Sequence, residues 1–307
     1  MKKMQFGKMF MLLLTATIWG TAFVAQSVGM DYVEPFTFTF VRNIIGGLVL
    51  IPCIWFLKKL KRKENRIESS GLQATTENHS GKLPVTRTEW IGGICCGVAL
   101  FLASNLQQIG IVYTTVGKAG FITALYVVIV PIMGIFFKKR VSILVWICVA
   151  LSVIGLYLLC MTEGSFSLNV GDFLTLLCAI MFSVHIMVID HFSPKGDGVV
   201  MSCIQFFVCG LLSGITMFFV ENPQIENMLA AWLPIIYAGV FSSGIAYTLQ
   251  VVAQKDMNPT IASLILCLES VVSAIAAWLI LHEAMTTREL VGCGLMFAAI
   301  VMANLDS

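Results

Sequence analysis

Long apolar segments separated by short polar breaks constrain this chain more than any single motif. A bilayer core about 30 Å thick needs about 20 apolar residues per helix. Charged residues make up 12% of the chain and hydrophobic residues 58%, whereas a soluble domain has about 25% charged residues. The pattern predicts an all-α integral membrane protein with ten transmembrane helices, at 9–28, 36–57, 89–110, 114–137, 141–161, 171–191, 199–220, 230–253, 258–281 and 287–304.

The placement of lysine and arginine predicts the orientation of these helices. Apart from Arg288, the basic residues that flank the segments fall on one side, before the first segment, after the second and in later alternate connections. The positive-inside rule therefore predicts a multi-pass protein of the cytoplasmic membrane with both termini in the cytoplasm. The polar stretch 58–88 is interpreted as a loosely held cytoplasmic loop, with anionic-lipid contact through its basic start as the alternative. Acidic residues lie in the connections of the opposite side, at Asp31, Glu34, Glu163, Glu221 and Glu226.

The ten cysteines all lie inside apolar runs and show no CxxC spacing. They are interpreted as small packing side chains rather than as metal or redox ligands. The net charge of +2 hides how the charges are distributed along the chain, and it does not imply a nucleic-acid partner. We expect no metal and no cofactor.

The second part of the chain repeats the first. An offset of about 163 residues places Trp19 over Phe182 and Arg42 over Gln205, and one near 144 places TTVGKAGFIT over NPTIASLILC. Each unit, 1–161 and 162–307, holds five predicted helices, and an odd number requires the second unit to be inverted relative to the first. Two inverted halves around a midplane site make alternating access available by symmetry.

Five phrases, taken in order, resemble one known family over nearly the whole chain: TATIWGTAFVAQ, FTFVRNIIGGL, AGFITALYVVIVP, GVFSSGIAYTLQ and IASLILCLESVVSAIAAWLILHEAMT. They are similar to the EamA-type transporters of the drug/metabolite transporter superfamily. The resemblance implies two inverted five-helix repeats, a central cavity lined mainly by helices one to four and six to nine, and peripheral helices five and ten through which a homodimer would form. It also implies cargo such as amino acids and related metabolites.

Two departures from the family pattern carry expectations. Glu269-Ser270 stands where the family has Glu-Pro, so we expect the helix kink at that position to be lost. Lys138, Lys139 and Arg140 stand where the first repeat has Gly-Glu-Arg, which resembles a subgroup that carries Tyr126 and Pro131.

Glu269 lies in the middle of the ninth predicted helix, about 16 Å from either end, too far for its carboxyl to reach water. A charged group at this depth costs about 3 kcal/mol on insertion scales, so its surroundings must compensate. A role in the cavity or in proton coupling is predicted, with a purely structural hydrogen bond as the alternative.

Arg42 shares a helix face with Thr39 and Gly46, a polar and small stripe suited to the bundle interior. The alternative, a side chain rising to the lipid headgroups, stays open, and for Lys118 it is the favoured interpretation. Trp19 is too deep for the interfacial aromatic belt, which leaves packing or substrate stacking. His185 is a second proton-coupling candidate, with a structural hydrogen bond as the alternative.

Polar residues at helical spacing complete the candidate cavity, since a polar metabolite needs uncharged hydrogen-bonding groups on apolar walls. The pairs Gly93 with Gly97 and Gly210 with Gly214 are interpreted as close helix contacts. The substrate-cavity candidates are Trp19, Gln26, Arg42, Asn105, Gln108, Thr123, Tyr126, His185, Gln205, Tyr247, Gln250 and Glu269.

These features predict a secondary transporter that moves a small polar or amphipathic metabolite, with the substrate and membrane lipids as partners. A passive channel or a receptor is the alternative. A membrane-embedded acyltransferase-like enzyme is remote, because His185 and Asp190 lie about 140° apart on a helix and no other catalytic motif occurs. The chain is therefore not expected to be an enzyme.

Overall fold

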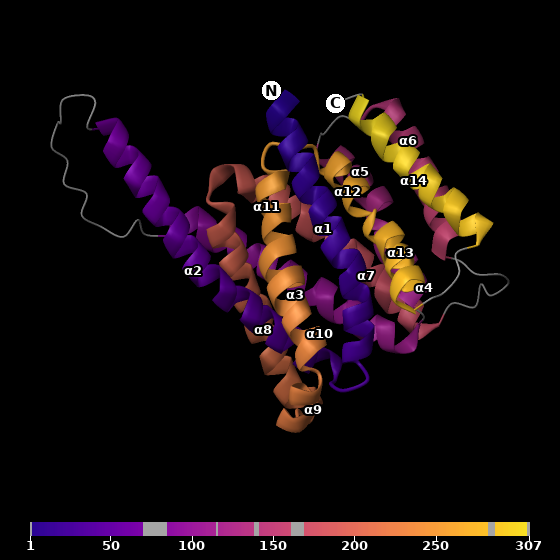
Figure 1. Ribbon diagram of the computed structural model, residues 1–307, viewed down its shortest axis with the longest axis horizontal. Coiled ribbons are helices and arrows are strands. Elements are labelled where there is room, and N and C mark those ends of the chain that lie inside the picture. Colours follow the sequence, from indigo (N-terminus) through magenta and orange to yellow (C-terminus); the bar gives the residue numbers. More distant parts are fainter. Residues whose placement is uncertain are drawn as a thin grey trace.

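The protein is a bundle of helices. A computed structural model describes residues 2–69, 85–114, 116–137, 141–160, 169–281 and 286–305, and no strand occurs within these ranges. Figure 1 shows the helices side by side, with α1 beginning and α14 ending at the same end of the bundle. The predicted all-α fold is confirmed.

Each predicted span coincides with one helix or a run of helices. Eight described segments are long and apolar enough to cross a membrane, and α6 adds a shorter apolar helix, so the count of ten stays a prediction. Two short elements, η1 (Ser193–Lys195) and α9 (Ile225–Ala230), lie in connections. The others are α1 (Lys2–Gly29), α2 (Pro35–Ser69), α3 (Arg87–Tyr113), α4 (Val116–Ala124), α5 (Tyr126–Phe136), α6 (Ile143–Cys160), α7 (Val170–Phe192), α8 (Gly198–Val220), α10 (Trp232–Ile236), the π-helix η2 (Tyr237–Tyr247), α11 (Thr248–Gln254), α12 (Pro259–Leu266), α13 (Glu269–Leu281) and α14 (Thr287–Leu305).

The connection predicted at 58–88 is shorter than expected. Helix α2 continues to Ser69, because the Lys, Arg and Glu residues after the apolar segment are good helix formers. Helix α3 begins at Arg87, and Thr86 and Glu89 form a capping box there. Residues 70–84, and also 138–140, lie outside the described part of the chain.

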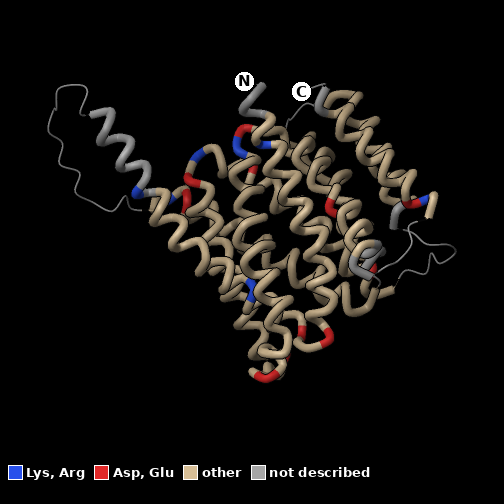
Figure 2. The backbone as a smooth tube through the Cα atoms, in the orientation of Figure 1, with Lys and Arg blue, Asp and Glu red and all other residues tan. Residues whose placement is uncertain are grey.

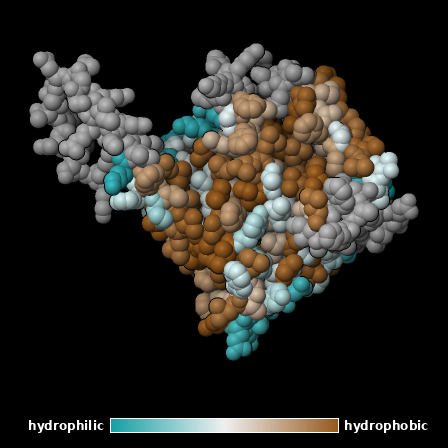
Figure 3. Space-filling model, in the orientation of Figure 1, coloured by the Kyte–Doolittle hydropathy of each residue, from teal (hydrophilic) through white to brown (hydrophobic). Residues whose placement is uncertain are grey.

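The outer surface fits a bilayer. On the face that Figure 3 shows, apolar residues cover much of the middle of the bundle, and the most hydrophilic residues lie toward its edges and lower tip. Figure 2 shows Lys and Arg where α1 begins, whereas the lower tip, around α9 and the α1–α2 connection, carries only acidic charges among the described residues. The nine cysteines whose side chains the structure describes are all free.

Helix packing follows an approximate twofold relation between the halves. Helix α1 packs on the eighth span, which consists of α10, η2 and α11. The counterpart of α1 is α7, and the counterpart of the eighth span is α3; these two also pack on each other. Likewise α1 packs on α12 and α13, while α7 packs on α4 and α5. Helix α2 packs on its counterpart α8, and α6 on its counterpart α14. The predicted dimer contact through α6 and α14 stays a prediction.

The crossing of α2 and α8 shows the same relation at the level of side chains. A Cβ atom on Gly47 would lie 3.0 Å from the ring of Phe207, and one on Gly210 would lie 2.9 Å from Cδ1 of Ile44. An offset of about 163 residues relates Gly47 to Gly210, and the same offset relates Ile44 to Phe207. The two helices therefore approach closely through equivalent contacts.

The predicted glycine pairs are confirmed as helix contacts. Gly93 and Gly97 face Ile204 and Val208 of α8, and Gly214 faces Phe40 of α2. Small residues at such positions allow two backbones to approach.

Two spans are broken in their middle. The fourth span is interrupted at Leu125, between α4 and α5, and the ninth at Cys267 and Leu268, between α12 and α13. At each break a backbone N–H bonds three residues back, from Leu125 to Ile122 and from Leu268 to Ile265, both at 3.2 Å. The expectation that Ser270 abolishes the kink is wrong, because the tight turn precedes position 270 and does not need proline there.

The beginning of the ninth span is as predicted. Pro259 occupies the first turn of α12, and the side chain of Asn258 caps that turn by accepting a hydrogen bond from the N–H of Thr260 at 2.9 Å.

Candidate functional site

A small cavity lies inside the bundle. Every side chain that lines it is buried except Trp19, which is half-buried, so the cavity is enclosed in this conformation. Among the described residues, α8 and the peripheral α6 and α14 contribute nothing to the wall. The lining residues are Trp19, Phe23, Gln26, Arg42, Gln107, Thr123, Tyr126, Phe182, Ile186, Ser242, Tyr247, Gln250, Leu266 and Glu269.

Most of the wall consists of equivalent positions from the two halves. Offsets of about 163 and about 143 residues pair ten of the fourteen lining residues with one another. The cavity therefore lies on the approximate twofold axis, where inverted-repeat transporters hold their sites. The pairs are Trp19 with Phe182, Phe23 with Ile186, Gln107 with Gln250, Thr123 with Leu266, and Tyr126 with Glu269.

The four remaining lining residues have counterparts outside the wall. They are Gln26, Arg42, Ser242 and Tyr247, and their counterparts are Ile189, Gln205, Ala99 and Ser104. At these four positions of the wall the halves differ.

Arg42 points into the bundle and is 3% exposed. Its Nη1 donates a hydrogen bond to Oε1 of Gln26 at 3.0 Å, and its guanidinium lies 5.6 Å from the centre of the Phe38 ring. Its Nε has no hydrogen-bond partner among the described residues. The geometry excludes the alternative of a side chain at the headgroups and places a cation with spare hydrogen-bonding capacity at the cavity.

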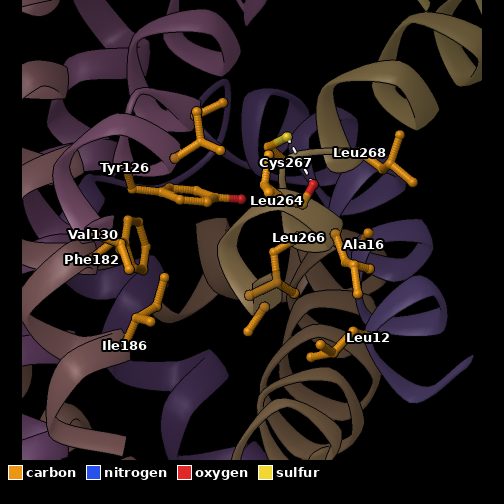
Figure 4. Close-up of a cluster of buried hydrophobic side chains, with 14 of the residues drawn as sticks. Leu12, Ala16, Tyr126, Val130, Phe182, Ile186, Leu264, Leu266, Cys267 and Leu268 are labelled. Carbon is orange, nitrogen blue, oxygen red and sulfur yellow. Dashed lines mark hydrogen bonds between the residues drawn. The ribbon is translucent and has the colours of Figure 1, made fainter. Parts of the chain in front are cut away.

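Glu269 lies across the wall on the first residue of α13. The hydroxyl of Tyr126, on the first residue of α5, donates a hydrogen bond to Oε1 of Glu269 at 3.1 Å. Figure 4 shows the Tyr126 ring reaching from α5 toward Leu264, Leu266 and Cys267 at the break of the ninth span. The two breaks thus bring two equivalent residues into contact.

The breaks also shape the local electrostatics. The first N–H groups of a helix lack intrahelical acceptors and carry partial positive charge. Because Tyr126 and Glu269 begin α5 and α13 and also line the cavity, both positive helix ends lie beside it. Half-helix N-termini at such a position favour an anionic substrate group.

An aromatic wall closes one side of the cavity. The rings of Trp19 and Tyr247 lie 4.5 Å apart, and Trp19 Nε1 donates to the carbonyl of Ser242 at 3.4 Å. Thr15 donates to the carbonyl of Ala246 at 3.1 Å. The π-helix η2 leaves these carbonyls available to side chains of α1, which fixes α1 against the eighth span. Trp19 both packs and lines the cavity, so its two interpretations stay open.

Four of the predicted cavity residues lie outside the wall. Asn105 donates to Ser213 of α8 at 3.0 Å, and Gln108 donates to the backbone carbonyl of Gln26 at 3.3 Å. His185 and Gln205 form a buried hydrogen bond of 3.1 Å with each other. Their spacing placed them on helices that border the cavity but did not fix the direction in which each side chain points.

Sequence reasoning missed several wall residues, of which Gln107 is the most polar. Its Nε2 donates to Oγ1 of Thr123 at 3.4 Å. Helical spacing pointed to the faces of Asn105 and Gln108, whereas the repeat itself was informative, since Gln107 is the counterpart of the predicted Gln250. The side chain of Lys118 lies outside the described part of the structure.

A second hollow of about 1,120 Å³ lies at the acidic end, between the α1–α2 and α8–α9 connections. Asp31 and Glu34 line it. Beside it, the carboxylate of Glu221 accepts hydrogen bonds from the backbone N–H groups of Phe36 and Thr37 at 2.7 and 2.8 Å, and Glu34 accepts one from the N–H of Asn222 at 3.1 Å. These bonds tie the start of α2 to the end of α8.

The apolar helices of the fold define the class: a multi-pass membrane protein, here with a buried cavity at its centre. A profile of the EamA-like transporter family matches residues 7–161 and again residues 169–305. The chain belongs to this family, and the resemblance seen in its sequence is confirmed.

Relatives and one solved structure agree with this assignment. An uncharacterized transporter of Archaeoglobus fulgidus is 29% identical over 300 residues, which cover 96% of this chain and 84% of that protein. An uncharacterized transporter of Methanothermobacter thermautotrophicus is 23% identical over 285 residues, covering 89% and 79%. A protein crystal structure matches with a TM-score of 0.73 at 18% identity, covering 96% of this chain and 95% of that one. The family and these names indicate a membrane transporter rather than an enzyme.

Proposed function

We propose that this protein is a secondary transporter that carries a small amphipathic zwitterion, such as an amino acid or a related metabolite, across the cytoplasmic membrane by alternating access. Both termini then lie in the cytoplasm, as the basic residues at that end of the bundle favour. The observation that carries the proposal is the enclosed cavity on the twofold axis between inverted halves.

The chemistry of the wall supports a zwitterionic substrate. Arg42 and the N-termini of α5 and α13 suit a carboxylate, and Glu269 suits an ammonium group. Phe23, Phe182 and Tyr247 suit an apolar or aromatic side chain. One cation and one acidic group match a substrate with no net charge better than a phosphate or a polyamine.

Glu269 is the proposed proton-coupling group. It is 5% exposed, and among the described residues its carboxyl accepts a hydrogen bond from the hydroxyl of Tyr126, which does not neutralise a carboxylate. A group so placed gains or loses a proton when the cavity opens to water or takes up a cationic group. Substrate binding and proton binding then compete or cooperate at one carboxyl.

The test is uptake into vesicles reconstituted with the pure protein. Labelled L-phenylalanine, L-leucine, L-lysine and L-glutamate are offered with and without a pH gradient, and empty vesicles and vesicles with the Glu269→Gln variant are the controls. We expect the neutral amino acids to be carried faster than the charged ones, and an imposed pH gradient to change the rate.

Counterflow separates a carrier from a channel. In vesicles preloaded with unlabelled substrate, a carrier transiently accumulates label, whereas a passive channel only equilibrates it. Equilibration without accumulation would reject alternating access and favour the channel.

A further inference from the structure

One position breaks the symmetry of the cavity. Arg42 of α2 lines it, but its counterpart Gln205 of α8 does not, although Gln205 is fully buried. Arg42 is hydrogen-bonded to Gln26 of the preceding helix, and Gln205 is likewise hydrogen-bonded to His185 of the preceding helix. Arg42 and its counterpart Gln205 thus each bond a polar side chain of the preceding helix, although Gln26 and His185 are not equivalent positions of the repeat.

The buried residues around Gln205 include polar atoms without hydrogen-bond partners among the described residues. Nε2 of Gln205 and Nδ1 of His185 have no hydrogen-bond partner among the described residues, and neither has the buried hydroxyl of Ser104 on α3. Unsatisfied polar groups inside a membrane protein each cost free energy. His185 of α7 and Gln205 of α8 contact each other, and Ser104 lies on α3, which packs on both of these helices.

Tyr247 separates this group from the cavity. Its ring lies 4.5 Å from that of Trp19, on the cavity wall, and 5.9 Å from the ring of His185 in an edge-on arrangement. The counterpart of Tyr247 under the repeat is Ser104 itself. In the present conformation the bulky Tyr247 lines the cavity, and the small Ser104 does not.

Inverted repeats exchange their conformations between the two states of a transporter. We infer that Gln205, His185 and Ser104 form a second substrate subsite. In the present conformation Tyr247 separates this subsite from the cavity. In the conformation that opens to the other side of the membrane, the subsite lines the cavity in place of Arg42. This inference rests on the proposed function. The subsite offers an amide donor and an imidazole nitrogen, which suit the carboxylate and ammonium groups of a zwitterion, but it carries no fixed charge.

The exchange has a consequence for affinity. A hydrogen bond to a charged group is about twice as strong as one between neutral groups. The state in which Arg42 faces the cavity therefore holds a carboxylate more tightly than the state in which Gln205 does. Substrate is captured on one side of the membrane and released more readily on the other.

The first test needs no knowledge of the substrate. The purified wild-type protein in lipid nanodiscs is treated with diethylpyrocarbonate, and carbethoxylation of each histidine is followed by mass spectrometry. His185 is fully buried and His191 is exposed, so His191 is the internal reference. We expect His185 to react within about tenfold of the rate at His191, because the opposite state opens it to water. Reaction at His185 only after unfolding would overturn the inference.

The second test exchanges the two equivalent residues. Arg42→Gln alone should lower uptake of labelled L-phenylalanine about tenfold, as loss of about 1.4 kcal/mol implies. The double variant Arg42→Gln with Gln205→Arg should regain uptake to within about threefold of wild type. The arginine at position 205 then supplies the cation to the cavity in the conformation in which that position lines it. Thr17→Val is the control: its exposed hydroxyl donates to the carbonyl of Leu13 in its own helix and does not line the cavity, so uptake should not change.

The outcomes are separable. Uptake by the double variant no better than by Arg42→Gln, in protein that elutes as a single folded species, contradicts the subsite. If the double variant does not fold, the reactivity of His185 decides. If the wild type carries none of the amino acids offered, the proposed function fails in its substrate, and the reactivity of His185 still decides the inference.

Discussion

Helices α2 and α8 cross at equivalent glycines, yet only α2 supplies a side chain to the cavity. The scaffold of the two halves is nearly the same, whereas their chemistry differs: Arg42, Gln26, Ser242 and Tyr247 line the wall, and their counterparts do not. Symmetry provides a fold with two conformations of similar energy. Under the proposed function, the departures from symmetry decide what is bound and how tightly in each conformation.

The largest effect is expected at Glu269, where the equivalent residue of the first half, Tyr126, carries no charge. Glu269→Gln keeps the size of the side chain and an acceptor for Tyr126 but removes the titratable group. Flux in reconstituted vesicles should fall about a hundredfold or more, which corresponds to about 2.7 kcal/mol in the barrier. The amount of protein in the membrane should be unchanged, and wild-type flux in the variant over a wide pH range would eliminate the coupling role.

The second largest effect is expected at Arg42, and it is compared with the effect at its counterpart Gln205. Arg42→Gln removes a charge-assisted contact worth about 1.5–3 kcal/mol, so the apparent KM for the best amino acid should rise about tenfold or more. Gln205→Ala removes only neutral contacts, worth about 1 kcal/mol, and should raise KM less than tenfold. Equal effects at the two positions would show that the charge of Arg42 does not contact substrate.

The glycine crossing tests the symmetric side of the comparison. Gly47→Leu and Gly210→Leu each push a side chain into space filled by Phe207 or Ile44, and overpacking costs about 1–3 kcal/mol. Both variants should lower the melting temperature by similar amounts. Gly294→Leu is the control, since nothing lies within 4 Å of a Cβ at that position. Loss of stability at one glycine alone would contradict the equivalence of the two contacts.

The sequence predicts the bundle better than it predicts the site. Apolar segments fix where spans run, because each must match the bilayer, and the position of Pro259 marks a helix start correctly. Side-chain direction is decided by contacts between helices distant in sequence. Asn105 turns to Ser213 of α8, and its neighbour Gln107, missed by helical spacing, turns to the cavity.

Local sequence patterns also did not predict the breaks in the fourth and ninth spans. Pro131 is inside α5 without ending it, and the ninth span is broken at Cys267 and Leu268 where no proline stands. Proline content alone therefore predicts neither break. The repeat was the unused signal: Leu125 and Leu268 are related by the same offset of about 143 residues that pairs Tyr126 with Glu269.

The smallest effect is expected from the contact that joins the two broken spans. Tyr126→Phe removes one hydroxyl and leaves the carboxyl of Glu269 without its hydrogen-bond donor. A net hydrogen bond is worth about 0.5–1.5 kcal/mol, so flux should fall about two- to tenfold, less than for Glu269→Gln. If Tyr126 acts only by holding Glu269 in place, adding Tyr126→Phe to Glu269→Gln should lower flux no further. Additive losses would instead mean that Tyr126 contacts substrate in its own right, so the double variant separates a positioning residue from a binding residue.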